Sequence, residues 1–337
     1  MSTSVDGPAT LADVAALAEV SLKTASRVFN GEPHVADRTR AKVLGAAREL
    51  SFQMNAPASM LRRGIGAPEV ALVIGDITNP FFAALARGAE GEARRRGGFL
   101  TLASSDESDV EEVRLIQEFA RRHVRGIVIA STLADHLPLD FIRERGAALV
   151  FVDRPPVGIE ADSVLLDNVA GARMATEHLL AHGHRRIAFV GDYERLATHR
   201  ERMQGFGSAM DAAGITHWRS NVHEGAHDAA SARELVASLL ERQDAPTAVL
   251  ASNNRIAVGA VSAMRLAGPG TAIIGFDDFD LAEVLGVTTV THDPSEMGRL
   301  AIERVFHAAA DPAARAEQFV LPTRLVVRGS GEIAPPA

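Results

Sequence analysis

The chain has 337 residues and a formal net charge of −8, shared unevenly: residues 1–63 carry 8 Lys and Arg against 6 Asp and Glu, and the remainder carries 27 against 37. An acidic body behind a mildly basic start disfavours nonspecific coating of nucleic acid and favours a localised footprint, and the length indicates about two domains beyond a small first one. Zero cysteines exclude disulfides and thiolate metal sites, no window is long and apolar enough to span a bilayer, and the first residues lack the features of a signal peptide. We therefore expect a cytoplasmic protein with no cofactor and no metal.

The first predicted elements are two short helices joined by a tight turn, after a loose tail over residues 1–8. The apolar positions of the first helix recur at helical spacing, at Leu11, Val14, Ala15 and Ala18. Ser21 suits the N-cap of a second helix, which buries Ala25, Val28 and Phe29 and exposes Lys23 and Arg27 on one face. This pattern predicts a helix-turn-helix whose second helix fits the major groove of DNA. The pattern alone also allows a helical hairpin whose Lys and Arg merely face water.

A third helix is predicted over residues 35–50, with Val43, Leu44, Ala47 and Leu50 on its apolar side, so that residues 9–52 close a small core. Four motifs run through this region and beyond it: Thr10-Leu11-x-Asp13-Val14-Ala15, Val20-Ser21-x-x-Thr24-x-Ser26-Arg27-Val28-x-Asn30, Thr39-Arg40-x-Lys42-Val43 and Asn55-x-x-Ala58-x-x-Leu61. Through these motifs residues 9–64 resemble the DNA-binding head of the lactose/galactose repressor (LacI/GalR) family.

The resemblance implies a set of DNA-contacting residues. They are Thr10, Ser21, Leu22, Lys23, Thr24, Ser26, Arg27, Asn30, His34 and Thr39 in the head, and Asn55, Ala58 and Leu61 in a hinge helix within a linker at 53–67. The family's hinge leucine enters the minor groove and kinks the duplex, and Leu61 holds the matching position. The alternative is that Leu61 packs on the neighbouring domain. Glu19 departs from the family, which has a turn glycine there; a left-handed backbone at Glu19 costs roughly 1–2 kcal/mol.

From residue 68 onward, short apolar strands alternate with helices, which is typical of parallel sheets covered on both faces. The predicted strands are 70–74, 99–102, 127–129 and 149–152 in a first set, and 164–166, 187–190, 248–250 and 272–275 in a second. The fold class is therefore α/β, with the three-helix head followed by two doubly wound lobes. The core resembles periplasmic sugar-binding proteins, which implies three crossovers, near Ser163, Val290 and Pro322. The predicted lobes are 68–163 with 291–322 and 164–290 with 323–330, followed by a tail at 331–337.

Signals for catalysis are weak, because the chain has no nucleophile elbow, no phosphate-binding loop and no metal-ligand motif. Polar residues at strand ends carry more information, since ligands bind at the carboxyl ends of parallel strands. By resemblance, the effector positions are Phe81, Phe82, Asp153, Thr198, Arg202, His227, Asn253 and Asp277. Their carboxylates, amide and guanidinium suit sugar hydroxyls, and the Phe rings suit a sugar face. The alternative is that Asn253 and Asp277 cap helices. Asn254 stands where the family usually has Asp.

These features predict a ligand-responsive transcriptional regulator, acting as a repressor, that binds a pseudo-palindromic DNA operator as a homodimer. A small sugar or sugar derivative in the interlobe cleft is the expected effector, and neither membrane contact nor enzyme activity is expected. Three alternatives stay open: a secreted sugar-binding transport protein, a regulator that needs a nucleoside-type corepressor, and a sugar-processing enzyme. His227 stands where a purine-type member has a stacking aromatic residue, which disfavours a nucleobase effector.

Overall fold

The computed structural model describes residues 9–29, 32–52, 69–267, 270–311 and 313–336. The chain divides into two compact units, a head up to Ala67 and a core from Pro68 onward. None of the described helices is long and apolar enough to cross a membrane.

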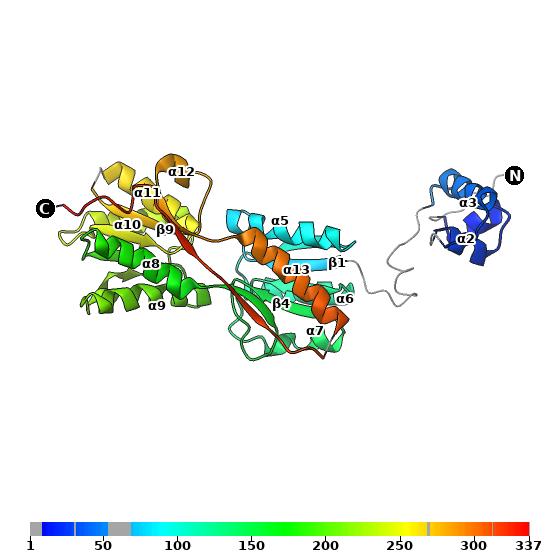
Figure 1. The fold of residues 1–337 in the computed structure, drawn as a ribbon, viewed down its shortest axis with the longest axis horizontal. Coiled ribbons are helices and arrows are strands. Elements are labelled where there is room, and N and C mark those ends of the chain that lie inside the picture. Colours follow the sequence, from blue (N-terminus) through cyan, green and yellow to red (C-terminus); the bar gives the residue numbers. More distant parts are fainter. Residues whose placement is uncertain (1–8, 30–31, 53–68, 268–269, 312, 337) are drawn as a thin grey trace. The chain divides into compact units, whose positions relative to one another are not determined.

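In its described residues the head contains three helices, α1 (Leu11–Leu17), α2 (Leu22–Phe29) and α3 (Asp37–Glu49) (Figure 1). Helix α1 begins after Thr10 because Thr10, its N-cap, and Asp13 form a capping box, in which the Thr10 N–H donates to Asp13 Oδ2 at 2.8 Å. The buried residues of the head come from all three helices: Val14, Ala15, Ala18, Ala25, Val28, Val43, Ala46 and Ala47. This arrangement confirms the predicted helix-turn-helix.

Two details of the head bear on the sequence predictions. Glu19 lies in the turn with φ 55°, so the left-handed backbone that glycine favours is present and a side chain strains it. Leu44 was predicted to face the core, but it is 41% exposed because Val43, Ala46 and Ala47 form the inward face of α3. The prediction for Leu44 was therefore wrong.

The first lobe of the core is a parallel sheet of six strands in the order β11-β5-β4-β3-β1-β2, counted over the described residues. Its strands are β1 (Glu69–Ile74), β2 (Phe99–Ser104), β3 (Gly126–Ile129), β4 (Ala148–Val152), β5 (Asp162–Leu166) and β11 (Gln318–Leu321). Its helices are α5 (Pro80–Arg95), α6 (Asp109–Arg121), η1 (Leu137–Leu139), α7 (Phe141–Glu144) and α13 (Pro294–Ala310). Val70, Leu72 and Ile74 of β1 pack under α5 and α13, whereas Ala71 and Val73 pack under α6 and α7.

Helices α5 and α13 approach each other closely on one face of this sheet (Figure 1). Gly88 of α5 lies against the backbone of Ser295, and Gly298 of α13 lies against the backbone of Leu85, with no room for a Cβ at either glycine. The two glycines therefore allow the helix that returns from the second lobe to seat against the first.

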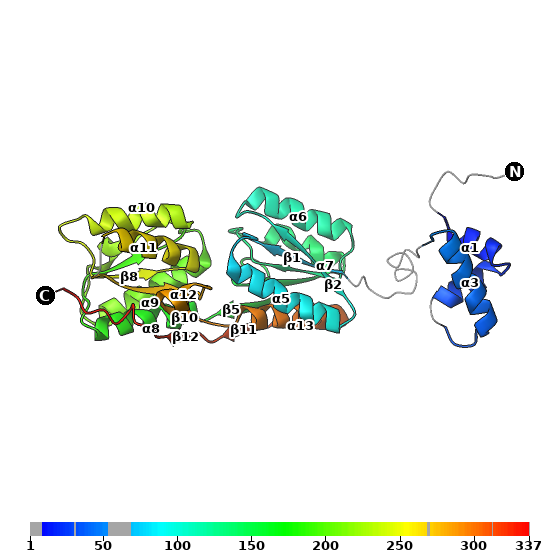
Figure 2. The same ribbon diagram turned by 90° about the horizontal axis from the view of Figure 1, so that it is seen from above.

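The second lobe repeats the arrangement with the order β12-β10-β9-β8-β6-β7, in which β12 alone runs antiparallel among the described strands. Its strands are β6 (Ile187–Val190), β7 (Val222–His223), β8 (Ala248–Ala251), β9 (Ala272–Phe276), β10 (Thr288–Thr291) and β12 (Arg324–Val326). Its helices are α8 (Asn168–Ala181), α9 (Ala197–Ala212), η2 (Trp218–Asn221), α10 (Ala229–Leu240), α11 (Asn254–Ala267) and α12 (Ala282–Leu285). Figure 2 shows α10 and α11 on one face of this sheet and α8 and α9 on the other, as their core clusters require.

Three crossings join the lobes, and their positions correct the predicted boundaries. Strand β5 was predicted to open the second lobe, but it pairs with β4 and β11 in the first sheet, so the first crossing lies after Leu166 and not near Ser163. The second crossing follows β10 at Thr291, one residue beyond Val290, and the third lies between β11 and β12 around Pro322. The sequence pattern identified β5 as a strand, but a strand's apolar run does not specify which sheet it joins.

The segment predicted as a tail from residue 331 lies against the second lobe. Glu332 contacts His178 Nε2 of α8, and His184 Nε2 lies 2.8 Å from the carbonyl oxygen of Ile333. Residues up to Ile333 therefore belong to the packed part of this lobe.

Candidate functional site

The carboxyl ends of the strands of both sheets face one cavity of about 60 Å³ between the lobes. It is lined by Asp76, Asn79, Phe81, Phe82, Glu107, Asp153 and Arg154 from the first lobe, and by Asp192, Leu196, Thr198, Arg202, His227, Asn253, Arg255 and Asp277 from the second. All eight predicted effector residues lie in this lining. Since ligand pockets have about 300–1,000 Å³, the cleft is nearly closed in this structure.

Arg202 on α9 is the most heavily bonded side chain of the cavity wall, and it is only 5% exposed. Its Nε donates to Asn168 Oδ1 at 2.8 Å, and its Nη1 donates to the Ser252 carbonyl at 2.6 Å and to Asp277 Oδ2 at 3.2 Å. The guanidinium carbon also lies 3.8 Å from the centroid of the Phe276 ring. These contacts hold Arg202 and Asp277 as a preorganised pair at the ends of β8 and β9.

Asp153 follows β4 and is the first lobe's counterpart to that pair. Its backbone is left-handed, with φ 66°, and its carboxylate is buried. Burial raises the pKa of Asp153 to about 6, although the positive charges of Arg154 and Arg202 oppose the shift. The neighbouring Arg154 is bonded to Glu107 through both Nη atoms, at 2.9 and 2.8 Å. Arg154 Nε lies 3.6 Å from Asp153 Oδ2 and has no hydrogen-bond partner among the described residues.

A third group of polar residues forms the second lobe's wall around Asp192. Asp192 accepts from Asn253 Nδ2 at 3.0 Å and lies 2.9 Å from His227 Nδ1, and this contact raises the pKa of His227. The imidazole of His227 stacks on Tyr193, with centroids 4.7 Å apart. Asn253 also accepts the Ile256 N–H at 2.8 Å, so it caps α11 while it lines the cavity. The predicted capping role is confirmed for Asn253, whereas Asp277 pairs with Arg202.

The remaining predicted residues, Phe81, Phe82 and Thr198, lie at the amino ends of α5 and α9. The two Phe rings pack edge to face with centroids 5.0 Å apart, and both belong to the core cluster of the first lobe. Helix α5 starts there because Asn79 accepts the Phe81 N–H at 3.0 Å and Pro80 occupies the first turn. The Phe rings therefore form a rigid apolar wall.

Side chains from the two lobes also meet directly across the cavity. Asn254 Nδ2 donates to Asn79 Oδ1 at 2.9 Å, Arg255 forms an ion pair with Asp76, and Arg195 Nη2 donates to the Glu107 carbonyl at 3.3 Å. The lobes are thus tied together at the cavity by side chains of both.

Asp76 and Asn79 lie in the polar stretch that follows β1, whereas Glu107, Arg154, Asp192, Leu196 and Arg255 are cavity residues that the sequence analysis missed. The strand-end rule that identified Asp153 also applies to Glu107, three residues after β2, and to Asp192, two residues after β6. Arg255 lies in the first turn of α11, and no local pattern separates it from a surface arginine.

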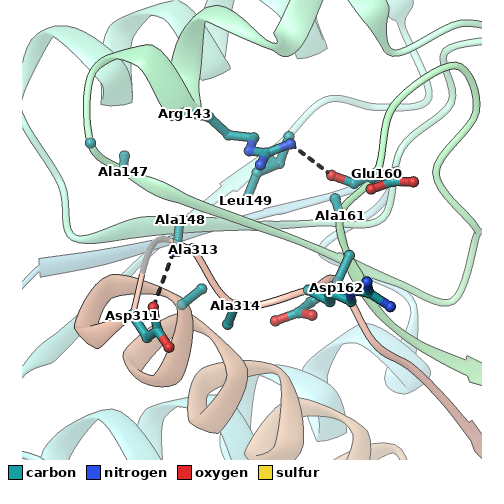
Figure 3. A pocket seen from close by; sticks show the side chains of 14 residues that line it. Arg143, Ala147, Ala148, Leu149, Glu160, Ala161, Asp162, Asp311, Ala313 and Ala314 are labelled. Atoms are coloured by element: carbon teal, nitrogen blue, oxygen red, sulfur yellow. Dashed lines mark hydrogen bonds between the residues drawn. The ribbon is translucent and has the colours of Figure 1, made fainter.

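A larger cavity of about 450 Å³ lies at the opposite, amino-terminal ends of β4 and β5 (Figure 3). Two of its charged side chains have protein partners: Arg143 donates to the Glu160 carbonyl at 3.1 Å, and Asp162 accepts from Arg304 at 3.1 Å and from the Glu317 N–H at 2.7 Å. Alanines form much of the remaining wall. Charged side chains from both lobes converge in the interlobe cavity, whereas the larger cavity is lined by the first lobe alone.

The outer face of α2 combines an apolar and a basic side chain at its start. Leu22 is 54% exposed and Lys23 is exposed, while the Thr24 N–H donates to Ser21 Oγ at 3.1 Å and so starts the helix. Arg27 is half-buried, and its Nε donates to Glu32 Oε2 at 3.0 Å.

The other predicted DNA contacts vary in their surroundings. Thr10 caps α1, Ser26 and Thr39 are half-buried, and His34 is exposed with φ 71°. Asn30, Asn55, Ala58 and Leu61 lie outside the described residues, as does the predicted hinge helix.

A helix-turn-helix head followed by a two-lobed core with an interlobe cleft defines a DNA-binding regulator with a ligand-binding body. The model of "Bacterial regulatory proteins, lacI family" matches residues 10–55, and the periplasmic binding protein-like domain model matches residues 176–331. The HTH-type transcriptional regulator DegA of Bacillus subtilis (strain 168) is 32% identical over 332 residues, which cover 95% of this chain and 97% of DegA. The chain therefore belongs to the LacI family of bacterial transcriptional regulators, as its motifs predicted.

Solved structures agree with this assignment. A transcriptional regulator CelR–cellobiose complex matches with a TM-score of 0.71 and 31% identity, over 96% of this chain and 99% of that chain. The Lac repressor dimer bound to operator and the anti-inducer ONPF matches with a TM-score of 0.84 over 97% of this chain and 100% of that chain. At 23% identity, the second match supports the fold alone.

Proposed function

We propose that this regulator is a repressor that binds a pseudo-palindromic operator as a homodimer, and that a small sugar-like effector in the interlobe cleft controls its affinity for DNA. The observation that carries the proposal is the cavity lined by charged and aromatic residues of both lobes. A ligand held by both lobes binds the closed form better than the open form, and only such a difference in affinity can shift a conformational equilibrium.

The chemistry of the wall suits a polyhydroxylated ligand. The Arg202–Asp277 pair offers both a donor and an acceptor to neighbouring hydroxyls, and Asp153 offers an acceptor from the opposite lobe. Phe81 and Phe82 supply an apolar surface for the C–H face of a sugar ring. The CelR structure named above holds cellobiose, which makes cellobiose a suitable first probe.

For the head, we assign operator contacts to the predicted residues, with Lys23 and Arg27 on the exposed side of α2 as the base-reading candidates. We assign the head to residues 9–52 and place the first crossing between the lobes after Leu166; the hinge expected over 53–67 lies outside the described residues. A homodimer mirrors a pseudo-palindromic site.

The second lobe carries exposed apolar side chains that would suit a subunit interface. They are Val258 and Leu266 on α11, and Leu281 and Val284 beside or on α12, which are 41%, 82%, 57% and 81% exposed. Burying large exposed apolar side chains against a second copy of the chain is favourable.

The chain is assigned no catalytic activity and a cytoplasmic location, because its relatives are named as DNA-binding regulators. A transport protein has no use for a helix-turn-helix head, which disfavours that alternative.

A direct test selects operator sequences from random duplex DNA with the full-length protein and then follows operator binding by fluorescence anisotropy while sugars and nucleosides are added. We expect an inverted repeat to be enriched and at least one sugar to change operator affinity. If no sequence is enriched, the DNA-binding role is contradicted. If only nucleosides change the affinity, the sugar assignment fails and the nucleoside-type regulator takes its place.

A further inference from the structure

The charges around the interlobe cavity do not balance. Five carboxylates line it, from Asp76, Glu107, Asp153, Asp192 and Asp277. Among the described residues, three guanidinium groups line it, from Arg154, Arg202 and Arg255. Even with His227 protonated through its contact with Asp192, the cavity keeps an excess of negative charge.

Each cavity arginine is already engaged with a carboxylate. Arg154 binds Glu107 through both Nη atoms and also donates to the Ser131 carbonyl at 3.1 Å. Arg202 is held by Asp277, and Arg255 is held by Asp76. Among these three guanidinium groups, the buried nitrogen without a hydrogen-bond partner in the described part of the chain is Arg154 Nε, and it lies 3.6 Å from the carboxylate of Asp153.

Asp153 carries the unbalanced charge. Its side chain is buried, and the contact at 3.6 Å with Arg154 Nε is its one ion contact within the part of the chain that the structure describes. An anionic group on a ligand would have to be desolvated beside Asp153 without a free cation to receive it. Like charges placed together in an interface weaken binding strongly, whereas hydroxyl and ammonium groups donate hydrogen bonds to the carboxylate.

We propose that the cleft accepts uncharged sugars and amino sugars but rejects phosphorylated and carboxylated ones, and that Asp153 is the residue responsible for this discrimination. The inference rests on the proposed sugar effector and narrows its chemical class. Neutral sugars and amino sugars both lack negative charge, so the cleft should bind the neutral form and the amino form of the same sugar.

The test is calorimetry of the full-length protein at pH 7.5 with matched sets of probes. These are glucose, galactose and ribose with their amino, phosphate and acid forms, together with cellobiose and cellobionate. For the sugar that binds, we expect the phosphorylated or acid form to bind at least about 100-fold more weakly, which corresponds to a like-charge penalty of this size. The amino form should bind within about tenfold of the neutral form.

The variant Asp153→Asn separates this mechanism from simple steric exclusion. Asn is compatible with the left-handed backbone at this position, so the substitution removes charge and little else. We expect it to weaken binding of the neutral sugar about tenfold and to improve binding of the phosphorylated form by at least as much. Asp244→Asn removes the same charge from an exposed site outside the cavity and should change neither affinity.

The outcomes distinguish the two proposals. A phosphorylated or acid sugar that binds as tightly as its neutral form overturns the charge rule while the sugar effector stands. Discrimination that survives unchanged in Asp153→Asn overturns the role of Asp153. Absence of binding by every sugar in the panel contradicts the proposed effector class itself.

Discussion

Asn254 at the start of α11 donates its Nδ2 hydrogen to Oδ1 of Asn79 at 2.9 Å and so joins the second lobe to the first. Asn79 caps α5 with the same oxygen, and the adjacent Arg255 pairs with Asp76. The amino ends of two helices from opposite lobes are therefore tied together at the cavity. Because the cavity of about 60 Å³ is much smaller than a sugar site, these contacts have to separate before a ligand enters.

The first prediction concerns this tie. Asn254→Asp replaces the donor with a carboxylate that faces the Asn79 oxygen, so we expect the open form to gain about 1–2 kcal/mol relative to the closed form. Sugar association should become faster, and the distance between labels on the two lobes should increase. The chain has no cysteine, so two introduced cysteines can be labelled cleanly for energy transfer. Asn221→Asp on η2 is the matched control, and an unchanged distance in Asn254→Asp would show that the contact does not hold the cleft shut.

The second prediction separates ligand binding from DNA binding. Asp277→Asn replaces a carboxylate acceptor at the cavity wall with a weaker amide acceptor. It should cost roughly 2–4 kcal/mol of effector affinity, because the hydrogen bonds between the ligand and this buried carboxylate are shielded from water. Asn tolerates the φ of 63° at this position, which makes this variant safer than Arg202→Ala. Truncating Arg202 would leave Asp277 buried without its partner and destabilise the lobe by about 3–5 kcal/mol.

Operator binding by Asp277→Asn without effector should stay within about twofold of wild type, since the residue lies in the core. If the effector is an inducer, the variant represses permanently, and if it is a corepressor, the variant fails to repress. Calorimetry paired with operator titration measures both properties. Normal effector affinity in this variant would move the site elsewhere.

Much of this site was predictable because it follows from how parallel sheets end. Asp153 and Asp277 were found as polar residues directly after buried strands, and the structure brings them to one cavity. Arg202 is on a helix, and it was identified through the family resemblance. Glu107 and Asp192 follow β2 and β6 at slightly greater distance, in loops whose course depends on tertiary packing.

The fold shows the same division between local and tertiary information. The apolar run of β5 predicted a strand, but its sheet is decided by pairing with β4 and with β11, a strand from more than 150 residues further on. Likewise Leu44 satisfies a helical period, yet the inward face of α3 consists of Val43, Ala46 and Ala47, which share the head's core cluster with residues of α1 and α2. Periodicity identifies elements, and their partners depend on the whole chain.

A third prediction concerns readout by α2. Arg27 is held by Glu32 in the free head, so it must exchange this partner for DNA. Exposed pairs are worth at most about 1 kcal/mol, and Glu32→Gln should therefore strengthen operator binding by no more than about fivefold. Arg27→Ala should cost about 1–3 kcal/mol and relax the preference at one base pair if Arg27 reads a base edge. Anisotropy titrations at two salt concentrations distinguish this from a phosphate contact, which would weaken all sequences alike.

The fourth prediction addresses the strained turn of the head. Glu19 has φ 55°, and its exposed ion pair with Lys42, at 3.6 Å, stabilises the head only slightly. Glu19→Gly should therefore raise the stability of the head by about 1 kcal/mol. Hydrogen exchange of the α1 and α2 amides should slow by about fivefold in the full-length protein. Glu49→Gly, near the end of α3, where the backbone is helical, is the contrasting control and should speed exchange.

The last prediction concerns pH. Asp153 has a pKa of about 6 in the folded core against 3.8 as an ordinary side chain, so its protonated form is the one that the fold favours. Its contribution to stability is then fully present below pH 3.8, declines as the pH rises towards 6, and is lost above that. Asp153→Asn stays neutral throughout. Its advantage over wild type should therefore grow across this window and reach at most roughly 3 kcal/mol near pH 7.

Urea unfolding followed by circular dichroism at pH 4, 5, 6 and 7 measures the difference between Asp153→Asn and wild type. The control Asp244→Asn has the opposite expectation, because the Arg242 side chain lowers the pKa of Asp244 and its contribution to stability is lost as the pH falls. A difference for Asp153→Asn that is constant from pH 4 to pH 7 would mean that this carboxyl titrates normally. The buried Asp153 carboxylate would then not destabilise the closed form. The excess negative charge assigned to the cavity would in that case be screened by solvent.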